Sequence, residues 1–305
     1  MEKDFQKMTA IETQSLSKTF SGDVKALTEV SFAIAEGAVF GFLGPNGSGK
    51  TTCIRVLNGI LSADSGNILI NEKPLTEHGI QVHSLCGVMT ENAALYENLT
   101  GQENLTFFGQ MQLMDETLIR ERSDYLLHYL GLDEAASRKA KTYSSGMKKK
   151  LSLAIALLHN PGILYLDEPT ASLDPESAKD VLELISRLAK EENKSVFLCS
   201  HQLRYIETIC NLYGFLNSGN LIAYGTFEQL LKKSTLDEKL HVRYAAKNQT
   251  ETNINEYVVH NDSEAAAIIS SIISEGNEIF EARRIIPQLE DLYFTFQNSV
   301  KDDNI

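Results

Sequence analysis

Along the first two-thirds of the chain, short continuous apolar runs alternate with segments of helical periodicity. The runs Ala38–Leu43 (AVFGFL), Ile163–Leu166 (ILYL) and Ser195–Cys199 (SVFLC) predict strands with apolar side chains on both faces, as in a parallel sheet covered on both sides. The segments Thr51–Leu61 and Glu176–Glu191 have the apolar spacing of amphipathic helices. This alternation predicts an α/β fold.

Between about residues 97 and 158 the pattern is helical throughout. Thr100-x-x-Glu103 has the form of a capping box, which marks the start of a helix. Long periodic runs follow through Phe107–Leu130 and Met147–Leu158. We therefore predict a helical subdomain over residues 97–158, inserted between elements of the sheet.

The composition shifts near Ser234. Between Ser234 and Ile305 there are six basic and thirteen acidic residues, a net charge of −7. The segment keeps a regular pattern, which predicts strands and helices at Leu240–Ala245, Tyr257–Val259, Ser263–Ser274, Glu278–Ile286 and Leu289–Gln297. We divide the chain into a first domain, residues 1–233, and a small accessory α/β domain, residues 234–305.

The charge balance argues against binding to nucleic acid. The 305 residues include 28 Lys and Arg against 41 Asp and Glu, a net charge of −13, whereas proteins that neutralise phosphate backbones carry the opposite sign. No stretch approaches the roughly 18 apolar residues of a membrane-spanning helix, and the amino terminus lacks the apolar core of a signal peptide. The four cysteines show no CxxC spacing. We expect a cytosolic protein with reduced, mostly buried cysteines.

A glycine-rich loop carries the clearest chemical signal. Residues 44–51 (GPNGSGKT) fit G-x-x-x-x-G-K-[ST] and lie between a predicted strand and a predicted helix. Glycines let backbone N–H groups surround phosphate oxygens, the lysine adds positive charge between the β- and γ-phosphates, and the threonine hydroxyl is a ligand for Mg²⁺. A chance match is on the order of one per cent in such a chain. The expected nucleotide-binding residues are Gly44, Pro45, Asn46, Gly47, Ser48, Gly49, Lys50, Thr51 and Thr52.

A second acidic element follows the strand Ile163–Leu166. Asp167 and Glu168 are adjacent, and because side chains alternate along a strand they are expected to point in different directions. Asp167 suits the Mg²⁺ side of a nucleotide site, and Glu168 suits the polarisation of an attacking water beside the γ-phosphate. The bland alternative is an exposed acidic strand end before Pro169.

Five further segments stand in an order that resembles the nucleotide-binding subunits of ABC transporters. They cover roughly residues 10–230 together with the loop and the acidic strand. They are Phe20 before the loop, Glu91 in GVMTEN, the signature-like Tyr143–Met147 (YSSGM), the D-loop-like Ser172–Pro175 (SLDP), and His201 after the third strand.

The resemblance implies a P-loop NTPase of the ABC ATPase type that binds ATP and Mg²⁺. Two copies, a homodimer in the simplest case, would sandwich ATP between the phosphate loop of one copy and Ser144, Ser145 and Gly146 of the other. Phe20 would stack on adenine, His201 would contact the γ-phosphate, and Asp174 would order the opposed site. Lys50, Glu168 and His201 would be catalytic, and hydrolysis would let the dimer open.

Two departures from the family's pattern bear on activity. Glu91 stands where the family usually has a glutamine; it can ligate Mg²⁺ or a water but cannot donate a hydrogen bond when ionised, which can lower ATP affinity or raise the Mg²⁺ requirement. Tyr143 and Ser145 replace the usual leucine and glycine of the signature. We nevertheless expect an active ATPase.

Each of these residues also has a simpler interpretation. Phe20 could be a core residue at a strand edge, and a single histidine such as His201 is more often structural than catalytic. Ser144 could be an ordinary helix cap. The run Lys148-Lys149-Lys150 would normally be a solvated helix face or part of a basic patch. The joint order of the motifs, rather than any one of them, favours the functional interpretation.

A nucleotide-binding subunit without a membrane segment needs a partner, here a transmembrane permease encoded separately. Residues 91–105 lie where such subunits usually receive a permease, with Leu95 and Tyr96 as apolar contacts, although ordinary packing explains them equally well. The ending LEDLYFTF and the segment GMKKKLSLA most resemble subunits of ABC-2 exporters. The chain would then lie at the inner face of the cell membrane. A soluble ABC ATPase and the ATPase of a binding-protein-dependent importer remain as alternatives.

Overall fold

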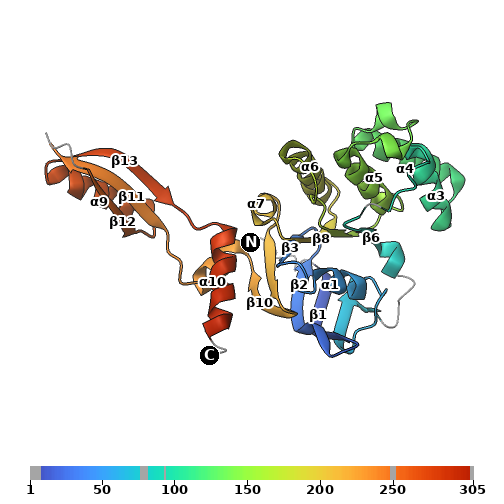
Figure 1. Ribbon diagram of the computed structural model, residues 1–305, viewed down its shortest axis with the longest axis horizontal. Helices are drawn as coiled ribbons and strands as arrows, with labels where there is room; N and C mark the ends of the chain where they lie inside the picture. Colours follow the sequence, from blue (N-terminus) through green and yellow to red (C-terminus); the bar gives the residue numbers. More distant parts are fainter. Residues whose placement is uncertain (1–7, 76–81, 93, 248–251, 303–305) are drawn as a thin grey trace, which may run out of the picture. The chain divides into compact units, whose positions relative to one another are not determined.

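The computed structural model describes residues 8–75, 82–92, 94–247 and 252–302. The chain divides into two compact units, Met1–Thr226 and Phe227–Ile305 (Figure 1). The first unit contains two sheets and the second unit one, and each unit has its own apolar core.

The first unit contains ten described strands and six described α-helices. The strands are β1 (Thr9–Phe20), β2 (Val24–Ala35), β3 (Val39–Leu43), β4 (Ser65–Ile70), β5 (Lys73–Pro74), β6 (Cys86–Met89), β7 (Ile163–Asp167), β8 (Ser195–Ser200), β9 (Leu212–Asn217) and β10 (Asn220–Gly225). The helices are α1 (Lys50–Leu57), α3 (Gly101–Met111), α4 (Glu116–Tyr129), α5 (Ser145–Leu157), α6 (Pro175–Glu191) and α7 (Leu203–Ile206).

A six-stranded sheet forms the centre of this unit, in the order β10-β9-β3-β8-β7-β6. Its strands β9, β3, β8, β7 and β6 are parallel, and β10 pairs with β9 in the antiparallel sense. Every residue of β3, β7 and β8 is buried, which confirms the strands expected from the three apolar runs. Because the strands are parallel, their carboxyl ends bring the phosphate loop, Asp167 and Ser200 to one edge.

An antiparallel sheet in the order β2-β1-β4-β5 lies against this centre; the sequence analysis did not predict it. The two sheets share one core, in which the rings of Phe32, Phe40, Phe42 and Phe197 lie with neighbouring centroids 5.2–5.8 Å apart. The pairing of β1 with β2 shifts register several times, for example between Thr13 and Leu16. These shifts break the period-two alternation by which a strand is recognised in a sequence.

Helices α3, α4 and α5 lie between β6 and β7 in the chain, where the helical subdomain was predicted (Figure 1). The capping box is confirmed, since the Thr100 hydroxyl accepts from the Glu103 N–H and the Glu103 carboxylate accepts from the Thr100 N–H. The prediction of one periodic run over Phe107–Leu130 was wrong. The chain turns at Leu113, whose φ is 57°, and Asp115 caps a new helix.

The second unit contains a three-stranded antiparallel sheet and three helices. Its elements are α8 (Phe227–Lys233), β11 (Lys239–Ala246), β12 (Asn253–Val258), α9 (Asp262–Ser274), β13 (Asn277–Ile285) and α10 (Leu289–Asp302). The strand order is β12-β11-β13. Leu240 and Val242 of the central strand pack with Ala265 and Ile272 of α9 in a small core. The α/β character expected from the pattern is confirmed.

Two expectations drawn from composition can be compared with the structure. All four cysteines are buried and free. Among the residues that the structure describes, no helix has the length and apolar character needed to cross a lipid bilayer.

Candidate active site

The phosphate loop connects β3 to α1, as the motif requires. Two of its glycines lie where no side chain fits. A Cβ atom on Gly44 would lie 2.2 Å from the carbonyl oxygen of Leu216, and one on Gly49 would lie 2.2 Å from that of Ala26. Gly49 also has a φ of 113°, in the left-handed region, and it precedes the first residue of α1. The backbone therefore approaches closely enough to present N–H groups at the amino end of a helix.

Lys50 is 95% buried and curls back over this loop. Its ammonium donates to the carbonyl oxygens of Gly44 at 2.8 Å and Pro45 at 3.1 Å. The same nitrogen lies 3.7 Å from Oε1 of Glu168. A cation held among neutral carbonyls beside one carboxylate is well placed to bind phosphate oxygens, since charge-assisted hydrogen bonds are the stronger kind.

Asp167 and Thr51 form the opposite side of the loop. The Thr51 hydroxyl donates to Oδ2 of Asp167 at 2.7 Å, while Oδ1 of Asp167 is buried without a hydrogen-bond partner. Burial, above all, raises the pKa of Asp167, and the charges of Glu168 and Glu91 act in the same direction. An orphaned carboxylate oxygen beside a hydroxyl is a donor set that fits Mg²⁺, which relieves the burial of negative charge.

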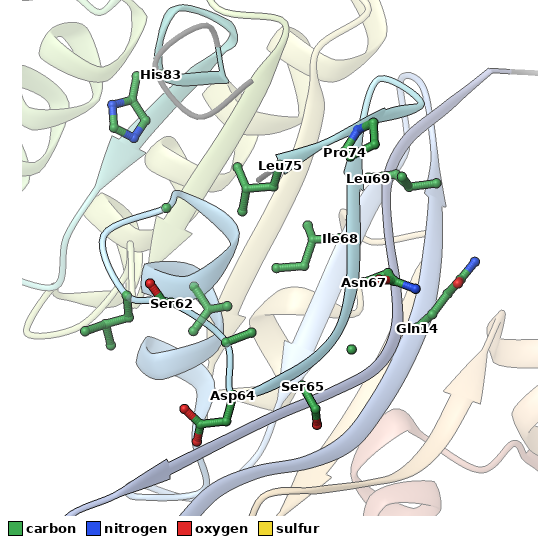
Figure 2. Close-up of a pocket in the computed structure, with 15 residues that line it drawn as sticks. Gln14, Ser62, Asp64, Ser65, Asn67, Ile68, Leu69, Pro74, Leu75 and His83 are labelled. Carbon is green, nitrogen blue, oxygen red and sulfur yellow. The ribbon is translucent and has the colours of Figure 1, made fainter. Parts of the chain in front are cut away.

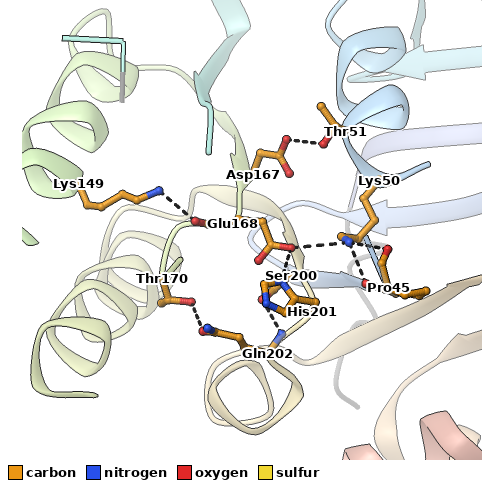
Figure 3. A network of polar contacts seen from close by, with 11 residues as sticks. Pro45, Lys50, Thr51, Lys149, Asp167, Glu168, Thr170, Ser200, His201 and Gln202 are labelled. Atoms are coloured by element: carbon orange, nitrogen blue, oxygen red, sulfur yellow. Dashed lines mark hydrogen bonds and ion pairs between the residues drawn. The ribbon is translucent and has the colours of Figure 1, made fainter. Parts of the chain in front are cut away.

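Glu168 is the first residue after β7, and its side chain points in a different direction from that of Asp167, as expected (Figure 3). Its Oε1 atom lies 2.9 Å from Nδ1 of His201, and its Oε2 atom is buried without a partner. Its backbone has a φ of 49°, uncommon for a residue with a side chain. Glu168 is 5% exposed, so the alternative of an exposed acidic strand end is wrong.

A cavity of about 360 Å³ lies beside Lys50, Asp167 and Glu168, whereas His201 is not among the described residues that line it. Phe20, which is 40% exposed at the end of β1, lines it together with Glu91, so Phe20 is not a core residue. The lining includes the expected residues Phe20, Asn46, Gly47, Gly49, Lys50, Thr51, Thr52, Glu91, Asp167 and Glu168. Ser48 is buried beneath the loop with an unpartnered hydroxyl.

The signature-like residues are not brought to this cavity. Ser144 caps α5, with its hydroxyl accepting from the Met147 N–H at 3.2 Å, so the helix-cap interpretation holds within a single chain. Asp174 caps α6 by accepting from the Ser177 N–H, and this hydrogen bond lowers the pKa of Asp174. Tyr143 is buried and donates to the carbonyl oxygen of Ala135, which explains how a tyrosine is accommodated here.

Lys149 lies in a place that the sequence did not predict. The run of three lysines suggested a solvated face, but Lys149 is 6% exposed and donates to the carbonyl oxygen of Glu91. It also donates to the carbonyl oxygen of Glu168 (Figure 3). A signal was present in the sequence. Lys149 shares the helical spacing of Gly146 and Leu153, both of which are buried on α5.

A second cavity, of about 620 Å³, lies between the end of α1 and the strand β4 (Figure 2). Ile68, Leu75 and His83 are among the residues around it. The described residues that line it include no lysine or arginine, so it offers no cation for a triphosphate. The expected nucleotide-binding residues Lys50 and Thr51 line the smaller cavity instead.

Comparison with known proteins agrees with this geometry. The ABC transporter family model matches residues 27–171. An uncharacterised ABC transporter ATP-binding protein of Bacillus subtilis, YhcH, is 32% identical, with the match covering 97% of this chain and 98% of YhcH. The linearmycin resistance ATP-binding protein LnrL of the same organism is 30% identical, over 87% of this chain and 90% of LnrL. Among solved structures, cbiO1 from Clostridium perfringens, part of the ABC transporter complex cbiONQ, superposes with a TM-score of 0.68 at 25% identity, covering 74% of this chain and 92% of cbiO1.

Proposed function

This chain belongs to the family of ABC transporter ATP-binding proteins, and we propose that Glu168 is the residue at which it activates water for ATP hydrolysis. As a member of that family the chain is an ATPase, and it powers export through a membrane permease that is a separate chain. The observation that carries the proposal is the position of the Glu168 carboxylate, 2.9 Å from His201 and 3.7 Å from the Lys50 ammonium.

The phosphate loop and Lys50 hold the triphosphate in this proposal. Backbone N–H groups at the start of α1 face the β- and γ-phosphates, and Lys50 exchanges its contacts with Gly44 and Pro45 for phosphate oxygens. Thr51 and Asp167 would hold Mg²⁺, with Glu91 as a further oxygen ligand, directly or through water. When bound there, Mg²⁺ would supply neutralisation of phosphate charge.

Glu168 accepts the proton of the attacking water. Glu168 is 5% exposed but lines the cavity, so its carboxylate can meet a water held there, and the contact with His201 orients Oε1. That leaves Oε2, which has no partner within the chain, as the oxygen available to a water beside the γ-phosphate.

Ser144, Ser145 and Gly146 lie outside the cavity of their own chain, and we propose that they complete the site of a second copy. Members of this family dimerise and work with a transmembrane permease. In a homodimer each ATP would lie between the phosphate loop of one copy and this helix start of the other. Asp174, at the start of α6, would order the opposed site.

We further propose that the permease docks beside Tyr96. Tyr96 is 48% exposed, and its ring lies 4.5 Å from that of Phe107 and 5.9 Å from that of Phe108. Asn104 fixes the loop by bonding both the N–H and the carbonyl of Tyr96. An aromatic cluster on a well-fixed loop suits a helix presented by a membrane partner. The chain would then work at the inner face of the membrane.

All residues assigned a role above lie in the first unit, so we propose that the domain 234–305 is accessory rather than catalytic. One relative, LnrL, is named a linearmycin resistance protein. We propose that the cargo of this chain is likewise an antimicrobial compound, carried by the permease rather than by this subunit.

Replacement of Glu168 tests the assignment. Glu168→Gln keeps the size of the side chain but removes the base, so turnover is expected to fall by about 10²-fold or more. ATP should still bind, and the protein with ATP should elute as a stable dimer on gel filtration. The control is Glu176→Gln, an exposed acidic residue at the start of α6. Near-normal turnover by Glu168→Gln would contradict the proposal.

A further inference from the structure

Lys149 differs from the lysines on either side of it. Lys148 and Lys150 lie at the surface and pair with Glu97 at 2.6 Å and Asp180 at 3.4 Å. Lys149, on the next position of the same helix, is 94% buried. Burial lowers the pKa of Lys149, and the nearby carboxylates of Glu91, Glu168 and Asp167 act in the opposite direction. A buried ammonium is retained only where its hydrogen bonds are satisfied.

The hydrogen bonds of Lys149 join three segments that are distant in the sequence. Its Nζ atom donates to the carbonyl oxygen of Glu91 at 2.6 Å. It also donates to the carbonyl oxygen of Glu168 at 3.1 Å (Figure 3). Glu91 follows β6, Glu168 follows β7, and Lys149 belongs to α5. One side chain thus holds together the two loops that carry the acidic residues of the nucleotide cavity.

The bond to Glu168 acts on a backbone that needs support. With a φ of 49°, Glu168 has a conformation that a residue with a Cβ atom adopts at a cost, so its surroundings must hold it. The Glu168 N–H donates to the carbonyl oxygen of Cys199 at 2.9 Å, and its own carbonyl accepts from Lys149. The direction of the carboxylate therefore depends on where Lys149 lies.

Lys149 and Ser144 are fixed to each other by the helix. Ser144 caps α5, and Lys149 lies about 1.4 turns further on, at about 7.5 Å along the axis. A helix of regular geometry moves as one piece over so short a distance. A shift of the signature residues on contact with a nucleotide therefore moves the ammonium that holds Glu168 and Glu91.

We propose that Lys149 is a positioning residue. When Ser144–Gly146 contact the nucleotide held by the opposed copy, Lys149 transmits this contact to Glu168 and Glu91 of its own chain. Each copy would then align its own hydrolytic site when its signature helix closes on the ATP of its partner. The two sites of a dimer are coupled through one buried side chain in each copy. This inference rests on the dimer described under the proposed function.

The first test compares Lys149→Met with Lys150→Met, its matched control on the next surface position. Lys149→Met is expected to lower kcat about 10- to 100-fold, because a carboxylate misplaced by about 1 Å loses this much. Binding of a fluorescent ATP analogue should change less than about twofold, since the phosphate loop is untouched. Lys149→Arg, which can donate to both carbonyls, should recover much of the loss. Equal kcat in the Met variants, or no recovery by Lys149→Arg, would overturn the inference.

A double-mutant cycle then tests the path of coupling. If Lys149 transmits the contact made by Ser144, the two substitutions act on the same path. The total loss of kcat in the double variant, Ser144→Ala with Lys149→Met, should then be much smaller than the product of the two single losses. A loss equal to that product, within about twofold, would overturn the inference. If Lys149→Met does not fold, as judged by urea unfolding, the cycle is run with Lys149→Gln, which keeps one donor group.

The same measurements separate this inference from the proposed function. Full turnover by Glu168→Gln would contradict the hydrolytic role of Glu168 itself. Suppose instead that Glu168→Gln loses turnover, while Lys149→Met keeps its kcat and its Hill coefficient for ATP. The ATPase assignment would then stand, and only the role of Lys149 would be removed.

Discussion

Nδ1 of His201 lies 2.9 Å from Oε1 of Glu168. Because an ionised carboxylate only accepts hydrogen bonds, this contact requires the imidazole proton on Nδ1. A neutral imidazole then has no proton on Nε2 with which to donate to a phosphate. A neutral His201 can thus orient Glu168 or donate to the γ-phosphate through Nε2, but only an imidazolium can do both.

His201→Ala removes both contacts. We expect kcat to fall by about 10²-fold, because Glu168 loses the group that fixes Oε1. ATP binding should weaken much less, since Lys50 and the loop remain. The comparison is with Gln202→Ala, whose side chain bonds Thr170 rather than Glu168. Steady-state kinetics of the two variants give the answer, and similar kcat values would rule out the role assigned to His201.

Asp167→Asn is expected to separate stability from activity. Burial raises the pKa of Asp167 in the folded chain, so its ionised form is disfavoured there. The sign follows from linkage: a carboxyl with a raised folded-state pKa favours the folded state when protonated, and this contribution is lost as pH rises through that pKa. The nucleotide-free variant should therefore be more stable than the parent at pH 7, and the difference should shrink at low pH.

Urea unfolding between pH 4 and pH 8 measures this difference, and Mg²⁺-dependent ATPase assays should show that the same variant has lost activity. Thr51→Val is the comparison, because it leaves both Asp167 oxygens without a partner within the chain. It should lower the free energy of unfolding by about 1–3 kcal/mol. If Asp167→Asn is less stable than the parent at pH 7, the Asp167 carboxylate is not a buried charge that only the metal relieves.

Two glycines of the phosphate loop should respond differently to a methyl group. Gly49→Ala places a Cβ 2.2 Å from the carbonyl oxygen of Ala26 at a φ of 113°, so the loop must move and ATP binding should be lost. Gly47 has a φ of 80° but no atom within 4 Å of such a Cβ. Gly47→Ala should cost about 1–2 kcal/mol in stability through backbone strain alone. Calorimetric titration with ATP measures the affinity of each variant. Equal affinities of Gly49→Ala and Gly47→Ala would contradict the prediction.

Tyr96→Ala should weaken association with the permease. The substitution removes an exposed ring from the cluster with Phe107 and Phe108, and an aromatic anchor of this kind is worth about 2 kcal/mol at an interface. Recovery of the permease with a tagged chain from detergent-solubilised membranes measures it. Leu118→Ala, which removes an exposed apolar side chain from α4, is the control. Equal recovery with both variants would place the docking surface elsewhere.

From the sequence we could predict the strands whose apolar pattern follows directly from their burial. The apolar runs at β3, β7 and β8 are buried on both sides, so polarity alone identifies them. The strands β1 and β2 were missed because their pairing shifts register repeatedly, and each shift moves side chains to the other face. Periodicity also did not show that the chain stops at Leu113 and restarts at Asp115.

The candidate site divides in a similar way. The glycine loop, Asp167 and Glu168 could be predicted because their chemistry is written in adjacent residues. The burial of Lys149 depends on the loops after β6 and β7, which meet only in the folded chain. Lys149 stands between Lys148 and Lys150, and a run of charged residues is typical of a surface. Only the helical spacing that Lys149 shares with Gly146 and Leu153 indicated that it is buried.

The left-handed backbone of Glu168 has a consequence for how such proteins change over time. A conformation of this kind costs about 1–2 kcal/mol with glutamate and little with glycine or asparagine. We expect that activity requires the glutamate despite that cost. In a related protein that does not need to hydrolyse ATP, that requirement would be absent. A residue with less backbone strain at this position would then make the folded chain more stable. Glycine or asparagine after the strand would then mark a subunit that binds nucleotide without consuming it.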